Sequence, residues 1–139
     1  MLLLIVRICL SAVFLYSGLT KLFDPAAGLA EMQAFGLPLP AFALAGTIVL
    51  QLAGGMAILA GTAARTSALM LAAFTLAATL LAHDFWHSPA DAFTRQLTVA
   101  LEHLAIIGGL VLLSATGPGR LRIATPLDRI DDAWLPAPR

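Results

Sequence analysis

The sequence predicts an all-α membrane protein that crosses the bilayer four times as a helical bundle. Of the 139 residues, 60% are hydrophobic and only 12% are charged, whereas a soluble globular protein carries about 25% charged residues. The apolar residues also fall into four continuous stretches, each close to the ~20 residues that a helix needs to cross the hydrocarbon core. Because so few polar side chains cannot cover a surface in water, the chain requires lipid as its solvent.

Glycine and proline separate the four predicted spans. The spans cover residues 2–23, 41–61, 66–86 and 97–115. Asp24-Pro25 follows the first, the segment 36–40 with two prolines precedes the second, and Gly117-Pro118-Gly119 ends the fourth. These residues are typical of turns and loops. We therefore expect loops at the breaks, a membrane domain over residues 1–119, and a tail over residues 120–139.

The first stretch is predicted to be a retained helix and not a cleaved signal peptide. No charged leader precedes the apolar run, and no clear small-x-small cleavage site lies between Arg7 and Lys21. Pairs of glycines occur in the second and fourth stretches, at Gly54-Gly55 and Gly108-Gly109. Small residues of this kind allow helix backbones to approach closely in lipid.

The distribution of basic residues predicts that both termini lie in the cytoplasm. Most of the arginines fall at one end of the predicted bundle, among them Arg7, Arg65, Arg120, Arg122 and Arg129. Only Lys21 and Arg95 fall at the other end. Because Lys and Arg are enriched in cytoplasmic segments, the end with most of the arginines is expected to be cytoplasmic. Within the first span, Arg7 is expected to extend its side chain to the headgroups.

The tail contains the sequence signs of a short helix. Thr125-Pro126 is typical of a helix start, and Asp128 follows three residues after Thr125. Leu127, Ile130 and Trp134 fall on one face. We interpret the tail as an amphipathic helix on the cytoplasmic membrane surface; a segment that docks a partner and a disordered tail are the alternatives.

Composition excludes some classes of function. The net charge is zero, so no broad basic field indicates a nucleic-acid partner. The single cysteine, Cys9, cannot form an intramolecular disulfide or a CxxC pair, and we expect it to be a small buried apolar residue.

Polar residues within or beside the spans are the candidates for chemistry, because ionisable groups in a span are costly and usually functional. They are Lys21 and Asp24 at the end of the first span, Gln51 in the second, His83, Asp84 and His87 around the end of the third, and Glu102 and His103 in the fourth. In the predicted orientation all except Gln51 gather towards the outer leaflet. A polar cluster reached from the periplasmic side is the prediction.

Glu102 and His103 form the main candidate pair. A carboxylate in a span must be protonated, paired or in contact with a wet cavity. One hypothesis makes Glu102 and a histidine a proton-accepting pair beside a bound small molecule, since histidine titrates close to physiological pH. The alternative is a structural ion pair with Lys21, Arg95 or a histidine. Gln51 could donate a hydrogen bond to a carbonyl-bearing ligand or to a neighbouring helix.

His83 and His87 are weak candidates for metal ligands. Their spacing places two imidazoles on one helix face, and Glu102 or His103 could complete a ligand set. Two histidines at a helix C-terminus are more often interfacial residues that the helix dipole favours.

Taken in order along the chain, these residues resemble the DoxX family of small four-helix membrane proteins. The matching features are Arg7, the segment 14–25, Gly36-Leu37-Pro38, Gly54-Gly55, Gly61, Arg65, His83, Phe85-Trp86, the segment 104–109 and the segment 117–120. Gln51 stands where the family pattern leads us to expect glutamate, and His103 where many relatives have asparagine. The resemblance implies a four-helix fold in the bacterial inner membrane.

The resemblance also implies classes of function, since some relatives are subunits of quinone-linked sulfur oxidoreductases and others belong to oxidative-stress complexes. We expect a membrane subunit of a quinone-linked redox system. Its predicted catalytic residues are Glu102, His103 and His83, its predicted ligand-binding residues are Gln51, Lys21 and Asp84, and its electrons come from a protein partner. A non-catalytic anchor or assembly subunit is the alternative, and a channel-like protein for a metal or small molecule ranks last. Self-association or a protein partner is expected in each case, because four helices form a thin core.

Overall fold

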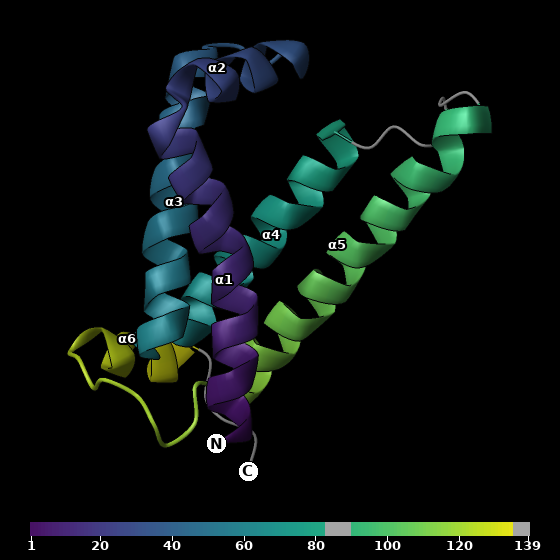
Figure 1. Cartoon of the computed structure of the whole chain (residues 1–139). Helices are drawn as coiled ribbons and strands as arrows, with labels where there is room; N and C mark the ends of the chain where they lie inside the picture. The colour runs from purple at the N-terminus through teal and green to yellow at the C-terminus, as the bar shows by residue number, and fades with distance from the viewer. Residues whose placement is uncertain (83–89, 135–139) are drawn as a thin grey trace.

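The computed structural model describes residues 1–82 and 90–134, and these residues form six helices and no strand (Figure 1). The helices are α1 (Leu2–Phe23), α2 (Pro25–Ala34), α3 (Pro40–Ala60), α4 (Ala64–Ala82), α5 (Ala90–Thr116) and α6 (Leu127–Trp134). Within the described residues, α1, α3, α4 and α5 are long and apolar enough to cross a membrane. The predicted all-α fold with four spans is confirmed.

The predicted span boundaries are close to the observed helix ends, with one clear difference. Helix α5 begins at Ala90, seven residues before the predicted start at 97. Its first turns contain Asp91, Thr94 and Arg95, so the helix is not apolar there and its start carries no hydropathy signal. The end predicted for the third span, 83–86, lies outside the described residues.

The segment between the first two spans is not simply a loop, so that part of the prediction is wrong. Residues Pro25–Ala34 form α2, which lies across one end of the bundle (Figure 1). Asp24 is its N-cap: the carboxylate accepts a hydrogen bond from the Ala27 N–H at 3.0 Å. Pro25 at the first helical position has the backbone angle that a helix start needs. With ten residues, α2 is too short to span the bilayer.

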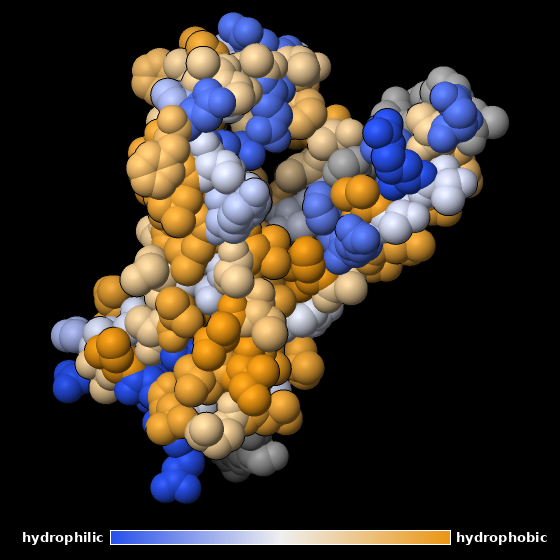
Figure 2. Space-filling view, viewed as in Figure 1, coloured by the Kyte–Doolittle hydropathy of each residue, from blue (hydrophilic) through white to orange (hydrophobic). Residues whose placement is uncertain are grey.

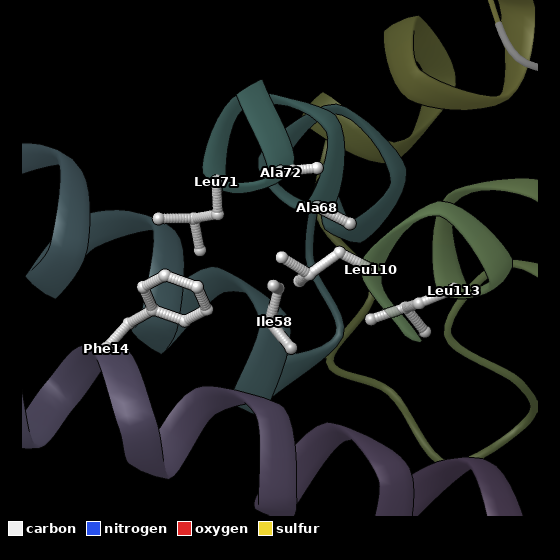
Figure 3. Packing of buried hydrophobic residues seen from close by; sticks show 7 residues of the cluster. All are labelled: Phe14, Ile58, Ala68, Leu71, Ala72, Leu110 and Leu113. Atoms are coloured by element: carbon white, nitrogen blue, oxygen red, sulfur yellow. The ribbon is translucent and has the colours of Figure 1, made fainter. Parts of the chain in front are cut away.

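The four spans pack as two pairs, α1 with α3 and α4 with α5, which meet towards one end and diverge towards the end where α2 lies (Figure 1). A buried cluster joins all four helices where they meet (Figure 3); it consists of Phe14, Ile58, Ala68, Leu71, Ala72, Leu110 and Leu113. Many large apolar side chains elsewhere are exposed, and they cover much of the visible surface (Figure 2). Such a surface suits lipid.

Glycines set the closest approaches between the spans. A Cβ on Gly54 would lie 3.1 Å from the Leu71 side chain, and one on Gly55 would lie 3.0 Å from Leu15. In the fourth span only Gly109 has such a neighbour, since a Cβ there would lie 3.2 Å from Leu10, whereas Gly108 has open space. Three of the four glycines therefore lie at close approaches between helices, as predicted.

Arg7 does not reach the headgroups, so this prediction is wrong. Its side chain is buried, with 1% exposed. Its guanidinium donates to the carbonyls of Ile58 and Leu59 at the end of α3. It also donates to the carbonyls of Pro118 and Leu121 beyond α5. Because the last carbonyls of a helix have no partner within it, Arg7 takes the place that water would fill.

Arg65 has the same role at the end of α5. It is also buried, and its Nη1 donates to the carbonyls of Ser114 and Ala115 at 2.7 and 2.8 Å. The helices that the two arginines cap each end in a glycine with positive φ, Gly61 (80°) and Gly117 (79°). A Cβ at either position would lie within 2.8 Å of a guanidinium nitrogen, so glycine is required for both its backbone angle and its size.

The tail forms the predicted short helix, but its carboxylates face the bundle. Asp131 of α6 is buried and accepts hydrogen bonds from the N–H groups of Arg65 and Thr66 and from the Thr66 hydroxyl, at 2.6–2.9 Å. Asp128 accepts from the Ala63 N–H at 3.0 Å, whereas Leu127 is exposed. Helix α6 is thus held on the start of α4 by its acidic side chains.

Candidate functional site

A cavity of about 360 Å³ lies between the two helix pairs, close to α2. Its wall comes from α1, α3, α4 and α5, and α2 with the turn after it contributes Glu31, Met32, Phe35 and Leu37. The space-filling view shows a recess where the pairs part (Figure 2). The cavity exists because the helices diverge at this end, while the cluster of buried residues holds them together at the other.

Most of the cavity wall is apolar, with a few polar groups among the apolar ones. The aromatic side chains in the wall are Phe14, Phe35 and Phe74. The polar side chains are Ser17, Lys21, Glu31, Thr47, Gln51, Thr75 and His103. An apolar wall with a small number of placed polar groups is the usual form of a small-molecule site.

Gln51 is the most deeply buried polar group of α3 in this wall, with 5% of the residue exposed. Its Oε1 is buried and has no hydrogen-bond partner. Buried carbonyl oxygens of side chains are nearly always hydrogen-bonded, because leaving one unsatisfied costs about 1–3 kcal/mol. Gln51 thus places an unsatisfied polar side chain in the wall of the cavity.

His103 is oriented by two threonines of α4. Its Nδ1 lies 2.8 Å from the Thr79 hydroxyl oxygen, and that hydroxyl donates to the Thr75 carbonyl at 2.6 Å. The Thr79 hydroxyl therefore joins the Thr75 carbonyl to His103 Nδ1, and this contact orients the imidazole.

An ion pair ties α2 to α1 at the cavity. Lys21 Nζ lies 2.9 Å from Glu31 Oε2, and the side chains are 15% and 40% exposed. A pair this exposed adds at most about 1 kcal/mol to stability. Its main consequence is positional, since it keeps α2 over the cavity.

The structure brings three of the predicted site residues together and leaves others apart. Lys21, Gln51 and His103 line the cavity. Glu102 is exposed and outside the cavity wall. Of the partners considered for Glu102 in the structural alternative, which were Lys21, Arg95 and a histidine, Lys21 pairs with Glu31.

The remaining predicted site residues, His83, Asp84 and His87, lie outside the described residues, and their roles stay predictions. Among residues 1–82 and 90–134, no three His, Cys, Asp or Glu side chains come together as metal ligands. Cys9, expected to be buried, is exposed on α1, where it faces the lipid side of the bundle.

The DoxX family model matches residues 2–84, which is more than half of the chain. The chain belongs to the DoxX family. The match covers α1 to α4 and so includes Arg7, Lys21, Glu31 and Gln51, whereas His103 lies beyond it.

Two proteins of Escherichia coli are similar to this DoxX protein over nearly their whole length. Inner membrane protein YqjF is 34% identical over 126 residues, which are 91% of this chain and 92% of YqjF. Inner membrane protein YphA is 27% identical over 122 residues, 88% of this chain and 87% of YphA. No solved structure matches the chain significantly. With four helices able to span a bilayer, this DoxX protein is a multi-pass protein of the bacterial inner membrane.

Neither Glu31 nor the threonines near the DoxX protein's cavity stand out in the sequence. Glu31 lies in a segment predicted to be a loop, although Asp24-Pro25 has the same N-cap and proline pattern as Thr125-Pro126. Thr47, Thr75 and Thr79 carry no signal in the sequence, since threonine is common in apolar helices. Only the crossing of the helices decides that they lie near the cavity.

Proposed function

We propose that this DoxX protein binds a membrane quinone in the cavity and serves as the membrane subunit of a quinone-linked redox system. The observation that carries the proposal is an apolar cavity within the spans whose wall includes a deeply buried polar side chain, Gln51.

The size and lining of the cavity support this class of ligand. Its volume of about 360 Å³ falls within the ~300–1,000 Å³ typical of small-molecule sites. Aromatic side chains from α1 and α4, Phe14 and Phe74, offer flat faces to a ring. A quinone has such a ring, with polar groups at opposite edges and an apolar tail that can extend into lipid.

The polar groups of the wall support exchange of protons. Reduction of a quinone takes up two electrons and two protons, and oxidation of the quinol releases them. His103, held by Thr79, is positioned to accept or return a proton at the cavity, because imidazole titrates near neutral pH. The electrons require a partner protein, because the one cysteine of the chain cannot form a dithiol pair.

A matched pair of alanine substitutions on α4 tests the proposal. Ala78 lines the cavity, whereas Ala73 is exposed on the same helix and outside the wall. The protein is purified from bacterial membranes, and its quinone and quinol are quantified by mass spectrometry. We expect close to one quinone per chain in the wild type and in Ala73→Phe, and at least a five-fold loss in Ala78→Phe, where the new ring fills the cavity.

Two results would overturn the proposal. One is a wild-type protein that carries no quinone above the level of the surrounding lipid. The other is an Ala78→Phe variant that folds and keeps its quinone. Either outcome favours the alternative of a non-catalytic anchor or assembly subunit, for which the test is whether partner proteins still co-purify with Ala78→Phe.

A further inference from the structure

The segment that joins α5 to α6, residues 117–126, lies at the depth where the spans end. The Leu121 carbonyl accepts a hydrogen bond from Arg7, in the second turn of α1, and the Ile123 N–H donates to the last carbonyl of α3. The segment extends to one side of the bundle before α6 begins (Figure 1). Because α1 and α3 are spans, these contacts place the segment at the boundary between the hydrocarbon core and the headgroups.

Three large apolar side chains of this region are exposed. Leu121 and Ile123 are 51% and 64% exposed, and Leu127, at the start of α6, is 56% exposed. At a membrane surface, apolar side chains that stand beside basic ones enter the boundary between the headgroups and the acyl chains. Lipid is therefore the environment that covers these three side chains.

The tail separates its charged side chains by sign. Asp128 and Asp131 are buried and accept hydrogen bonds from N–H groups at the start of α4. Arg120, Arg122 and Arg129 are exposed. The whole chain has a net charge of zero, yet burial of these two carboxylates leaves the arginines at the surface. The exposed apolar side chains are therefore bordered by positive charge.

We propose that an anionic phospholipid binds to five side chains of the tail, which we call the tail surface: Arg120, Leu121, Ile123, Leu127 and Arg129. Guanidinium groups pair with phosphate through two parallel hydrogen bonds, and the three apolar side chains contact the acyl chains of the same lipid. This proposal does not depend on a quinone site, because the cavity lies at the other end of the bundle, close to α2.

An anionic phospholipid matches both parts of the tail surface, whereas other ligands match one part. A soluble phosphate would pair with the arginines but leave the apolar side chains in water. A zwitterionic lipid would cover the apolar side chains, but its headgroup has no net charge. Each basic residue near an anionic membrane surface strengthens binding about five-fold, so the charge of the headgroup decides which lipid is preferred.

The retention of lipids measures this preference. The full-length protein is reconstituted in vesicles of equal parts phosphatidylglycerol and phosphatidylcholine with identical acyl chains. It is then extracted in mild detergent, and its bound lipids are counted by native mass spectrometry. We expect the wild type to retain phosphatidylglycerol over phosphatidylcholine by about five-fold or more.

Substitution of the two arginines tests which residues set the preference. In the double variant Arg120→Gln/Arg129→Gln, the retention of the two lipids should agree within about two-fold. Arg122 is left unchanged, because its charge acts on Asp128. Arg95→Gln, which removes an exposed arginine near the start of α5, is the matched control and should keep the wild-type ratio.

Two further measurements separate a lipid from phosphate alone. The double variant Leu121→Ser/Ile123→Ser keeps the arginines and should lose at least about half of the retained phosphatidylglycerol, because its acyl chains lose apolar contact. Millimolar glycerol phosphate, added to the wild type during extraction, should not displace the lipid.

Equal retention of the two lipids by the wild type overturns the proposal, as does an Arg120→Gln/Arg129→Gln variant that keeps the wild-type ratio. Displacement by glycerol phosphate, or unchanged retention in Leu121→Ser/Ile123→Ser, would assign the tail surface to the phosphate group alone and would also overturn it. The two wild-type measurements need no variant, so a folding defect cannot obscure the result.

Discussion

Arg7 illustrates how a charged side chain is accommodated inside a membrane bundle. It is fully surrounded by protein, and its guanidinium reaches carbonyls in two separate places, the end of α3 and the segment after α5. Arginine suits this position because its planar group carries five donors in fixed directions. By satisfying those carbonyls, the arginine stabilises the end of the bundle.

Replacing Arg7 by methionine should strongly destabilise the protein. The variant leaves the carbonyls of Ile58 and Leu59 without their side-chain donors, and we expect a loss of about 3 kcal/mol or more in the free energy of unfolding. Unfolding in detergent, followed by far-UV circular dichroism, measures it. Arg120→Met, at an exposed position, is the control, and an Arg7→Met variant as stable as Arg120→Met would contradict this account.

Glu102 should be dispensable for binding in the cavity. It is exposed on α5 and outside the cavity wall, so Glu102→Gln should retain quinone within about two-fold of the wild type. His103→Leu, which changes a residue of the wall, should lose most of it. The same mass-spectrometric measurement compares the two. A Glu102→Gln variant depleted of quinone would mean that the carboxylate reaches the ligand.

At the scale of the elements, α6 serves as an N-cap for α4 from a distant part of the chain. The first N–H groups of a helix lack partners within it. For α4 these donors are satisfied by Asp128 and Asp131, about 65 residues away in sequence. The Ile123 N–H also donates to the Ala60 carbonyl at the end of α3. The tail is therefore bound to the membrane domain at the first backbone N–H groups of α4 and at the last carbonyl of α3.

Asp131→Ala should loosen this attachment. It removes three hydrogen bonds to Arg65 and Thr66, and the loss of a helix cap costs about 0.5–2 kcal/mol. We expect faster hydrogen exchange at the amides of Arg65 and Thr66 and a lower unfolding temperature. Arg129→Ala, an exposed residue of the same helix, should change neither. Unchanged exchange in Asp131→Ala would show that α6 is not the cap.

The attachment of α6 should weaken in acid. Burial alone would raise the pKa of Asp128, but hydrogen bonds from the N–H groups of Thr125 and Ala63 and the charge of Arg122 outweigh it, so the pKa lies below its ordinary value. Because folding lowers the pKa of this carboxyl group, the group stabilises the folded protein at pH values above its pKa in the unfolded chain, about 3.9. It loses that contribution as the pH falls through the pKa of the folded state.

Hydrogen exchange at the Ala63 and Thr125 amides, corrected for the intrinsic effect of pH on exchange, measures this dependence. The protection of these amides should fall as the pH falls below about 4, and Asp128→Asn should give weak protection at every pH tested. Loss of protection in the wild type already near neutral pH would contradict the role of the carboxylate.

The whole molecule is asymmetric along the membrane normal. At one end the arginines, the α6 carboxylates and the core cluster close the bundle, and at the other end the pairs diverge around the cavity (Figure 1). Among the described arginines of the closed end, Arg7 and Arg65 bond to carbonyls inside the protein, whereas Arg120, Arg122 and Arg129 are exposed. The exposed three carry the positive-inside signal.

The closed end should face the cytoplasm and the cavity end the periplasm. Single cysteines placed at Pro38 and at Arg129, in a Cys9→Ser background, test this in intact cells. An impermeant maleimide should label Pro38→Cys and leave Arg129→Cys unlabelled until the membrane is opened. The reverse pattern would invert the protein and place the cavity end in the cytoplasm.

The amino-acid sequence alone determined the class of the fold and the extent of its spans. Length and apolarity of a stretch are local properties, so the ends of α1 and α3 could be predicted within a residue or two. The cap at Asp24-Pro25 is equally local, and α2 could have been recognised from it. Among the residues that line the cavity, Lys21, Gln51 and His103 could be predicted from the sequence, because polar residues are easily noticed within apolar helices.

Only the tertiary structure decided which polar residues share a site. Glu102 and His103 are neighbours in the sequence, yet one is exposed and the other lines the cavity. Arg7 and Gln51 both lie within spans, yet each guanidinium nitrogen of Arg7 is hydrogen-bonded while the oxygen of Gln51 has no partner. The physical reason is that the direction of each helix face, and the distance between helices, depend on how all four spans cross, and no single stretch of the sequence contains that information.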